Sequence, residues 1–270
     1  MAKTIIHISD LHFGTENLTF VQTLLKEINQ YKPDLVIVSG DFTQRARKKQ
    51  FKAASEFLNK IPYAKIVIPG NHDVAFFNLF YRIFNPLRRF KKHIHPDLYP
   101  CFKNSEIAVL GVDSTASHKW KSGHLSKTQI EIIKNKLSSI DNKLFKILAM
   151  HHNILPSPGS KIKKSIENYS HFIRAVDQCG LDLILSGHLH KSYCGNTQEH
   201  YQTHDAILVI QAGTAVSRRR RGEANSYNLI TINGNKIGIQ VRGIEKNRFL
   251  LLNDYSFQKT NSRRVLNSDF

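Results

Sequence analysis

The chain has 270 residues, of which 41% are hydrophobic and 22% are charged, and this composition excludes an intrinsically disordered protein. No apolar run reaches the roughly 18 residues that a membrane-spanning helix needs, and the N-terminal segment is too short and too polar for a secretory signal, so we expect a cytoplasmic protein. The 39 lysine and arginine residues against 21 acidic residues give a net charge of +18, which implies an acidic partner such as nucleic acid, anionic lipid or a phosphorylated metabolite.

Short apolar runs alternate with helical patterns through the first two thirds of the chain. Buried strands are predicted over residues 4–9, 35–39, 65–69, 106–113, 145–150 and 181–186. Helices are predicted between them, over residues 18–31, 46–60, 126–140 and 168–179. Helices interleaved with apolar strands indicate an α/β sheet that is covered on both faces.

Strand patterns without helices follow in the last third of the chain. Consecutive antiparallel strands are predicted over residues 206–211, 226–232 and 236–243, the last two joined by a hairpin turn at Asn233-Gly234. Together with the alternating part, they predict a four-layer αββα sandwich. From about Lys246 the sequence lacks clear periodicity, so we predict one domain over residues 1–245 and a C-terminal tail or surface strap over residues 246–270.

Potential metal ligands follow the ends of five predicted strands. In chain order they are Asp10 and His12, Asp41, Asn71 and His72, His151 and His152, and His188 and His190. The carboxyl edge of an open α/β sheet is where ligands bind, so we expect all five loops to line one crevice.

Carboxylate, imidazole and amide donors at this edge suit a binuclear centre of Mn, Fe, Zn or Co. Asp41 lies centrally in the chain order and is the expected bridging ligand. The remaining donors divide into two groups, Asp10, His12 and His190 for one metal and Asn71, His151 and His188 for the other. Of the neighbouring imidazoles, His151 is preferred to His152 because it is nearer the strand end, and His152 is left to orient substrate or support the ligands.

These blocks resemble, in order, the motifs of the calcineurin-like metallophosphoesterases. The matching residues are Asp10-Leu11-His12, Gly40-Asp41, Gly70-Asn71-His72-Asp73, His151 and Gly187-His188-Leu189-His190. The paired His151-His152 and the residues Gly123, Leu125 and Gln129 make the sequence most similar to the bacterial branch related to cyclic-nucleotide phosphodiesterases. The resemblance implies hydrolysis of a nucleotide-type phosphodiester by a metal-bound hydroxide, with the two metals on Asp10, His12, Asp41, Asn71, His151, His188 and His190.

The resemblance also implies a role for His72. In that family the histidine at this position is not a metal ligand but sits over the substrate, where it stabilises or protonates the leaving oxygen. An imidazole with a pKa near 6.5 is suited to donate a proton to a departing alkoxide. His72 and Asp41 are therefore the expected catalytic residues.

Two basic segments depart from what a nucleotide enzyme needs. From Val74 to His95, aromatic and aliphatic residues alternate with five arginine and lysine residues. This pattern is typical either of an interfacial segment that lies on anionic lipid or of a helix that packs its aromatic face on the sheet. The run from Arg218 to Arg221 is expected to be a solvated loop or to recruit phosphates.

Two other functions compete with the phosphodiesterase. The first is a peripheral membrane hydrolase of a lipid-linked phosphodiester or pyrophosphate, similar to the UDP-diacylglucosamine pyrophosphatase of lipid A synthesis. It accounts for the aromatic and basic segment, but that family usually has arginine where this chain has His72. The second is a nucleic-acid-binding protein or nuclease, and a mere binding module has no need of seven metal-binding side chains.

Overall fold

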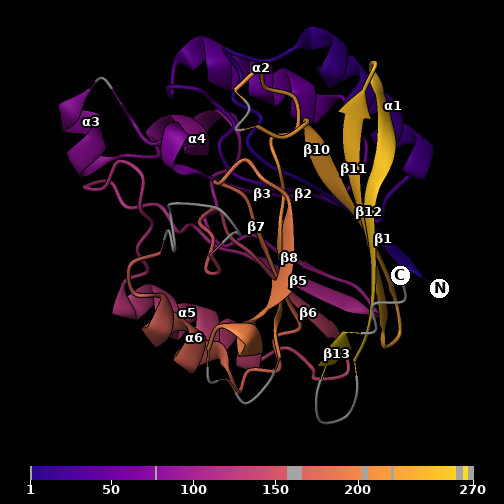
Figure 1. Ribbon diagram of the computed structural model, residues 1–270. Helices are drawn as coiled ribbons and strands as arrows, with labels where there is room; N and C mark the ends of the chain where they lie inside the picture. Colours follow the sequence, from indigo (N-terminus) through magenta and orange to yellow (C-terminus); the bar gives the residue numbers. More distant parts are fainter. Residues whose placement is uncertain are drawn as a thin grey trace.

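The computed structural model describes residues 2–76, 78–156, 166–201, 203, 206–219, 222–259 and 264–266. Two β-sheets pack face to face between two layers of helices, as Figure 1 shows, with α1 and α2 on one outer side and α5 and α6 on the other. The predicted αββα sandwich is confirmed. Within the described residues, every helix is too short or too polar to cross a bilayer.

The first sheet has the strand order β13-β12-β11-β10-β1-β2-β3. Its parallel part is formed by β1 (Lys3–Ile8), β2 (Leu35–Ser39) and β3 (Lys65–Ile68). Its antiparallel part consists of β10 (Ser226–Asn233), β11 (Lys236–Glu245), β12 (Arg248–Lys259) and β13 (Arg264–Leu266). Because β10 pairs with β1, the end of the chain completes the sheet that its beginning starts.

The second sheet has the order β4-β5-β6-β7-β9-β8. Its four central strands are parallel, namely β5 (Ile107–Gly111), β6 (Phe145–Ala149), β7 (Leu183–Ser186) and β9 (Leu208–Gln211). Both edges are antiparallel, formed by β4 (Cys101–Lys103) and β8 (Tyr193–Asn196). Every residue of the central strands is buried, as a sheet covered on both faces requires.

Helices cover the outer face of each sheet. The first sheet carries α1 (Leu18–Tyr31), α2 (Lys48–Asn59) and α4 (Arg88–His93), and the second carries α5 (Lys127–Ser138) and α6 (Tyr169–Val176). Asn17 caps α1 through its side-chain oxygen, and Ser126 with Gln129 forms a capping box at the start of α5. One short helix, α3 (Leu79–Phe84), projects from the side of the molecule (Figure 1). Single 3₁₀ turns are formed by Asn71–Asp73 and Thr197–Glu199.

One expectation about the last third of the chain is wrong in detail. Strand β9 is not part of an antiparallel run with β10 and β11, but lies in the other sheet, parallel to β7. Residues 206–210, which lead into and through most of β9, form a continuous apolar run, and such a run carries no information about which sheet it joins. Residues 248–259 of the predicted tail form β12, which pairs with β11 from Arg248 to Gln258 with one register shift at Val241/Arg242.

The long strand β12 escaped sequence analysis because most of its side chains are exposed to solvent on both faces. Such a strand shows no alternation of apolar and polar residues. Residues 260–263 and 267–270 of the predicted tail lie outside the described part of the chain. The division of the chain at residue 245 stays a prediction.

Candidate metal centre

Five loops meet where the carboxyl ends of β1, β2 and β3 face those of β6 and β7. The two sheets therefore both contribute to one buried cluster of polar side chains. The backbone N–H of His188, after β7, donates to Asp10 Oδ2, after β1, at 3.0 Å. All nine candidate residues that sequence analysis placed at the strand ends lie in this region, although they come from positions as far apart as 10 and 190.

The first group consists of Asp10, His12, Asp41 and His190, which are all buried. The Nε2 atoms of His12 and His190 lie only 3.2 Å apart. Asp10 Oδ1 lies 3.3 Å from His190 Nε2, and Asp41 Oδ2 lies 3.5 Å from His12 Nε2. His190 Nδ1 is 2.9 Å from the carbonyl oxygen of Arg219, so Nδ1 carries the proton and leaves the Nε2 lone pair directed at the group.

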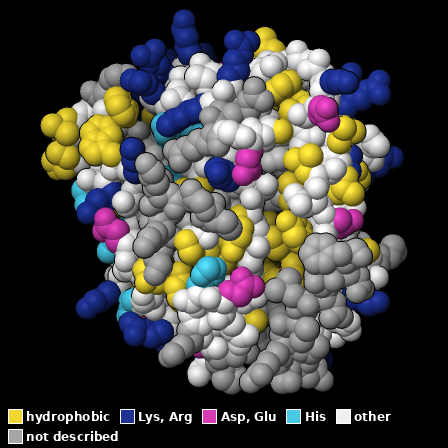
Figure 2. Space-filling view, in the orientation of Figure 1, with side chains coloured by type: hydrophobic (Ala, Val, Ile, Leu, Met, Phe, Trp, Pro, Cys, Tyr) yellow, Lys and Arg dark blue, Asp and Glu magenta, His cyan; other side chains and the backbone are white. Residues whose placement is uncertain are grey.

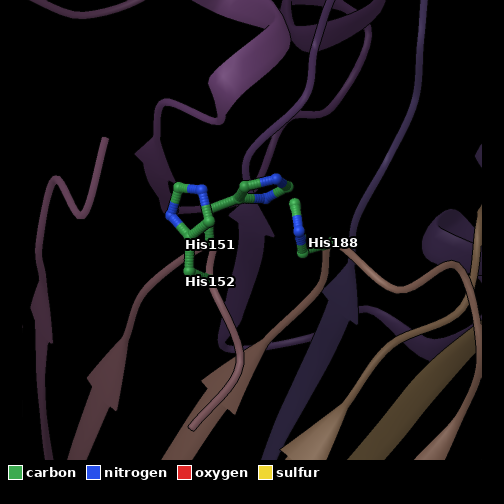
Figure 3. Close-up of side chains that lie close together, drawn as sticks. All are labelled: His151, His152 and His188. Carbon is green, nitrogen blue, oxygen red and sulfur yellow. The ribbon is translucent and has the colours of Figure 1, made fainter. Parts of the chain in front are cut away.

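The second group is built around Asn71, His151 and His188. Asn71 Oδ1 lies 3.2 Å from His151 Nε2 and 3.1 Å from His188 Nδ1, while its amide nitrogen donates to the Trp120 carbonyl. His151 Nδ1 is 2.8 Å from the Ser39 carbonyl oxygen, to which it donates. In Figure 3 the rings of His151, His152 and His188 lie next to one another at the ends of their strands.

His152 differs from its neighbour in what it contacts. His151 Nε2 lies 3.4 Å from Asp41 Oδ1, whereas His152 Nδ1 forms a 2.9 Å hydrogen bond with Ser114 Oγ. The Nε2 atom of His152 is buried without a hydrogen-bond partner and shares a potential ligand group with His151 and His188. Ser114 therefore orients the ring of His152, whereas His151 contacts Asp41, the carboxylate that lies between the two groups.

Asp41 connects the two groups electrostatically. Burial alone favours its protonated form, but the surrounding imidazoles, chiefly His151, outweigh burial and hold the pKa of Asp41 well below its usual range. In return, Asp41 overcomes the effect of burial on His151 and raises the pKa of that imidazole to about 9. Metal-free protein therefore holds a proton on His151 at neutral pH, which a metal ion must displace on binding.

These donors fit two metal ions. Asp10 Oδ1 is buried without a hydrogen-bond partner, which is costly for a carboxylate unless a cation is bound. When a metal ion displaces the proton of His151, its Nε2 becomes an acceptor that faces Asn71 Oδ1, another acceptor, at 3.2 Å. Two acceptors at this distance repel each other unless a proton or a cation lies between them.

The backbone of the site is strained at the same residues. Asp10, His12, Asp41, His188 and His190 all adopt positive φ angles, from 46° to 73°. Each non-glycine residue in this left-handed region costs on the order of 1 kcal/mol, and such residues cluster at functional sites. The cost is local to the loops that aim the side chains at the two groups.

Two glycines keep the loops close enough. A Cβ atom on Gly70 would collide with the Asp41 carboxylate, and one on Gly187 would collide with Ser9 Oγ. Asp73 accepts hydrogen bonds from the backbone N–H groups of Phe42, Thr43 and Gly70. The side chain of Asp73 and the absence of a Cβ atom at Gly70 together hold the loop that carries Asp41 against the loop that carries Asn71.

His72 lies beside the first group without joining either one. Its ring packs edge-on against His12, with 4.9 Å between ring centroids. Nδ1 is 2.7 Å from the Gln44 carbonyl and donates to it, so Nε2 is an acceptor, and Arg219 Nη1 donates to Nε2 at 2.9 Å. Burial, with a contribution from Arg219, lowers the pKa of His72.

Two residues were not predicted as functional from the sequence, namely Arg219, which contacts the site, and Asp113, which lies at the same sheet edge. Arg219 was included only in a general basic run, and the structure sets its guanidinium against His72 and its carbonyl against His190. Arg220 and Arg221 of that run lie outside the described residues. Asp113 follows β5 at the same sheet edge as the other candidates, so the strand-end rule that found them would also have found it.

A sandwich of two sheets with paired imidazole and carboxylate groups at its edge defines a dinuclear metal-dependent phosphoesterase. The family model for calcineurin-like phosphoesterases matches residues 3–192, and the chain belongs to this family. The matched span contains all seven residues of the two groups and ends just after His190.

Relatives with curated names are phosphodiesterases. A probable cyclic nucleotide phosphodiesterase of Coxiella burnetii is 28% identical over 202 residues, which are 70% of this chain and 76% of the relative. A glycerophosphodiester phosphodiesterase of Enterobacter lignolyticus is 26% identical over 197 residues, 68% of this chain and 69% of the relative. Both names describe enzymes that hydrolyse phosphodiesters.

Solved structures agree on the fold. A purple acid phosphatase from yellow lupin seeds superposes with a TM-score of 0.71 at 12% identity, covering 97% of this chain and 54% of that one. A dimetal phosphatase from Danio rerio gives a TM-score of 0.62 at 13% identity, covering 93% of this chain and 98% of that one.

The buried carboxyl of Asp113 predicts a pH-dependent stability. Burial raises its pKa to about 6, so the folded state favours the protonated acid, and the stabilisation present below pH ~4 is lost as the pH rises through about 6. We expect Asp113→Asn to be more stable than the wild type at pH 8, by up to ~3 kcal/mol, and to lose this advantage near pH 4. Urea unfolding at both pH values measures the difference.

Asp141→Asn is the matched control. Asp113 and Asp141 each accept a hydrogen bond from the backbone N–H two residues ahead, but Asp141 is exposed. Its substitution should change stability little at either pH. An Asp113→Asn variant that is equally or less stable than the wild type at pH 8 would contradict the burial argument.

Proposed function

We propose that the protein hydrolyses a nucleotide-type phosphodiester, cyclic or linear, with two metal ions. The observation that carries this proposal is the pair of donor groups that share Asp41, with Oδ1 toward His151 and Oδ2 toward His12. Bound together, two divalent ions activate a water molecule as nucleophile and neutralise charge on the phosphate oxygens. The names of the relatives, cyclic nucleotide and glycerophosphodiester phosphodiesterases, support a diester as substrate.

Seven side chains would hold the metals. Asp41 would bridge the two ions, and the other six would divide into one set on each side of it, Asp10, His12 and His190 and then Asn71, His151 and His188. The carbonyl oxygens of Ser39 and Arg219 support this assignment, because each fixes the tautomer of an imidazole with Nε2 directed inward. Nitrogen and oxygen donors without sulfur favour Mn, Fe, Zn or Co.

His72 and Arg219 would act on the substrate. The Gln44 carbonyl holds the ring of His72 by Nδ1, which leaves Nε2 available for the leaving oxygen. Arg219 donates to that same Nε2 in the substrate-free protein. When a phosphate displaces this contact, the guanidinium is left to bind a phosphate oxygen. His72 Nε2, no longer occupied by the arginine, would then take up a proton from solvent and donate it to the leaving oxygen.

The comparisons do not favour the lipid-linked substrate considered from the sequence. The named relatives act on other diesters, and this chain has His72 where the lipid A enzyme family usually has arginine. A nuclease or nucleic-acid-binding role and a cytoplasmic location stay predictions.

The substrate proposal is tested with manganese-loaded protein on a panel of phosphoesters. We expect hydrolysis of bis(p-nitrophenyl) phosphate and of cyclic or linear nucleotide diesters, with lower kcat/KM for p-nitrophenyl phosphate and for a lipid pyrophosphate. A preference for the monoester or for the lipid pyrophosphate would overturn the proposal.

The bridging role of Asp41 is tested by metal content. Because Asp41 contacts both groups, Asp41→Ala should retain at most one weakly bound ion per chain, as measured by elemental analysis after gel filtration. Asp254→Ala, an exposed carboxylate on β12, should retain the wild-type content. Two tightly bound ions in Asp41→Ala would refute the assignment.

His72→Ala should separate metal binding from proton transfer. We expect near wild-type metal content but turnover lower by ~10²–10⁴-fold, the usual contribution of a general acid. The loss should be smallest for esters of p-nitrophenol, because such a good leaving group needs little protonation. Loss of metal from this variant would instead make His72 a ligand, and an equal loss for good and poor leaving groups would exclude proton donation.

A further inference from the structure

The helix α3 is inverted with respect to an ordinary surface helix. Its four large apolar residues are exposed, with exposed fractions of 70% for Leu79, 64% for Phe80, 61% for Ile83 and 71% for Phe84. The residue on its inner side is Arg82, which is buried. An apolar cluster of this kind on the surface marks an interaction site.

Arg82 holds α3 in this orientation. Its guanidinium stacks on Trp120, with 4.0 Å from the guanidinium carbon to the ring centroid, and donates to the carbonyl oxygens of Ala75 at 3.1 Å and Lys119 at 2.9 Å. Trp120 in turn offers its carbonyl to Asn71 at the metal centre. The outward direction of the apolar side chains is therefore built into the packing, and rotating α3 inward would expose a hydrogen-bonded arginine.

A cavity of about 290 Å³ lies at the base of α3, between α3, α4 and the start of α2. Its lining combines apolar groups, such as Ala75 and Pro86, with four cations, which are Lys48, Arg88, Arg89 and Lys92. Asp73 is the single acidic residue among those lining it, and its carboxylate is taken up by backbone N–H groups of the metal-site loops. The sequence contains no acidic residue from position 74 to 96.

We propose that this surface docks on an anionic phospholipid bilayer. The four apolar side chains of α3 enter the boundary between headgroups and acyl chains, and the cations of the cavity bind lipid phosphates beside them. Figure 2 shows the hydrophobic group at one edge of the molecule with lysine and arginine side chains next to it. Trp120, which is 56% exposed and adjacent to α3, has the amphipathic ring that is enriched at such boundaries.

Charge complementarity favours a bilayer over a second copy of this chain. Two copies paired through α3 would bring the same cations face to face, on chains that each carry a net charge of +18. A bilayer with anionic headgroups supplies both the apolar region and the negative charge. The docking does not depend on the substrate proposed above, because α3 and the cavity contain none of the residues assigned to the metals.

The experiment is sedimentation of full-length protein with vesicles of phosphatidylcholine and phosphatidylglycerol, compared with vesicles of phosphatidylcholine alone. The wild type should bind the anionic vesicles at low salt and be released at about 1 M salt, where the Debye length falls to ~3 Å. Lys48→Gln, Arg88→Gln and Lys92→Gln combined should lower the partition coefficient on the order of 100-fold, since each cation near an anionic surface contributes about fivefold. Phe80→Ser with Phe84→Ser should lower it by ~10-fold or more.

Matched controls change the same chemistry elsewhere. Leu250→Ser with Leu251→Ser removes two exposed apolar side chains from β12, and Lys127→Gln, Lys134→Gln and Lys136→Gln remove three exposed cations from α5. Both controls should bind vesicles like the wild type, and thermal unfolding should confirm that every variant is folded.

Three results would overturn the proposal. One is wild-type protein that stays in the supernatant with anionic vesicles at low salt. Another is an equal loss of binding in the control variants, which would reduce the effect to overall charge or hydrophobicity. The last is a wild-type dimer in sedimentation velocity that Phe80→Ser with Phe84→Ser dissociates while vesicle binding is unchanged, since α3 would then bind a second copy.

Discussion

The buried carboxylate of Asp41 is the group on which the rest of the site depends. Its two oxygens face opposite ways, Oδ2 toward His12 at 3.5 Å and Oδ1 toward His151 at 3.4 Å, and the backbone N–H of His72 donates to Oδ1 at 2.8 Å. An isolated carboxylate in such a position would be costly, so imidazoles from both sheets must converge on it. The absence of a Cβ at Gly70 gives that carboxylate its room.

The energetically costly features of the site lie at the residues that are proposed to bind the metal ions. The loops carry positive φ angles at five site residues, Asp10 Oδ1 has no hydrogen-bond partner, and imidazole nitrogens of His12 and His190 face each other at 3.2 Å. The unpartnered carboxylate oxygen of Asp10 is unfavourable in the metal-free chain and is relieved by a cation among the donors. Because a ligand that binds only the folded state stabilises it, the free energy of metal binding is coupled to the free energy of folding.

The segment from Val74 to His95 contains two short helices, one of which buries its phenylalanine side chain while the other exposes its phenylalanine side chains to solvent. The sequence allowed either a helix packed by its aromatic face or an interfacial element. In the structure α4 buries Phe90 against the first sheet, whereas α3 directs Phe80 and Phe84 outward. What separates the two helices is the contact of Arg82 with Trp120, a residue that is distant in sequence and that no periodicity in the segment reveals.

The sequence by itself determined the buried parallel strands and the residues at their ends, because such a strand is a continuous apolar run and its carboxyl end is where ligands bind. That rule places Asp41 and His188 at one edge without knowledge of the sheets. Only the tertiary structure decided that β9 joins β7, that β12 extends the first sheet and that Arg219 reaches His72. These depend on pairing and packing between distant segments, and neither a short apolar run nor a strand exposed on both faces encodes its partner in its own pattern.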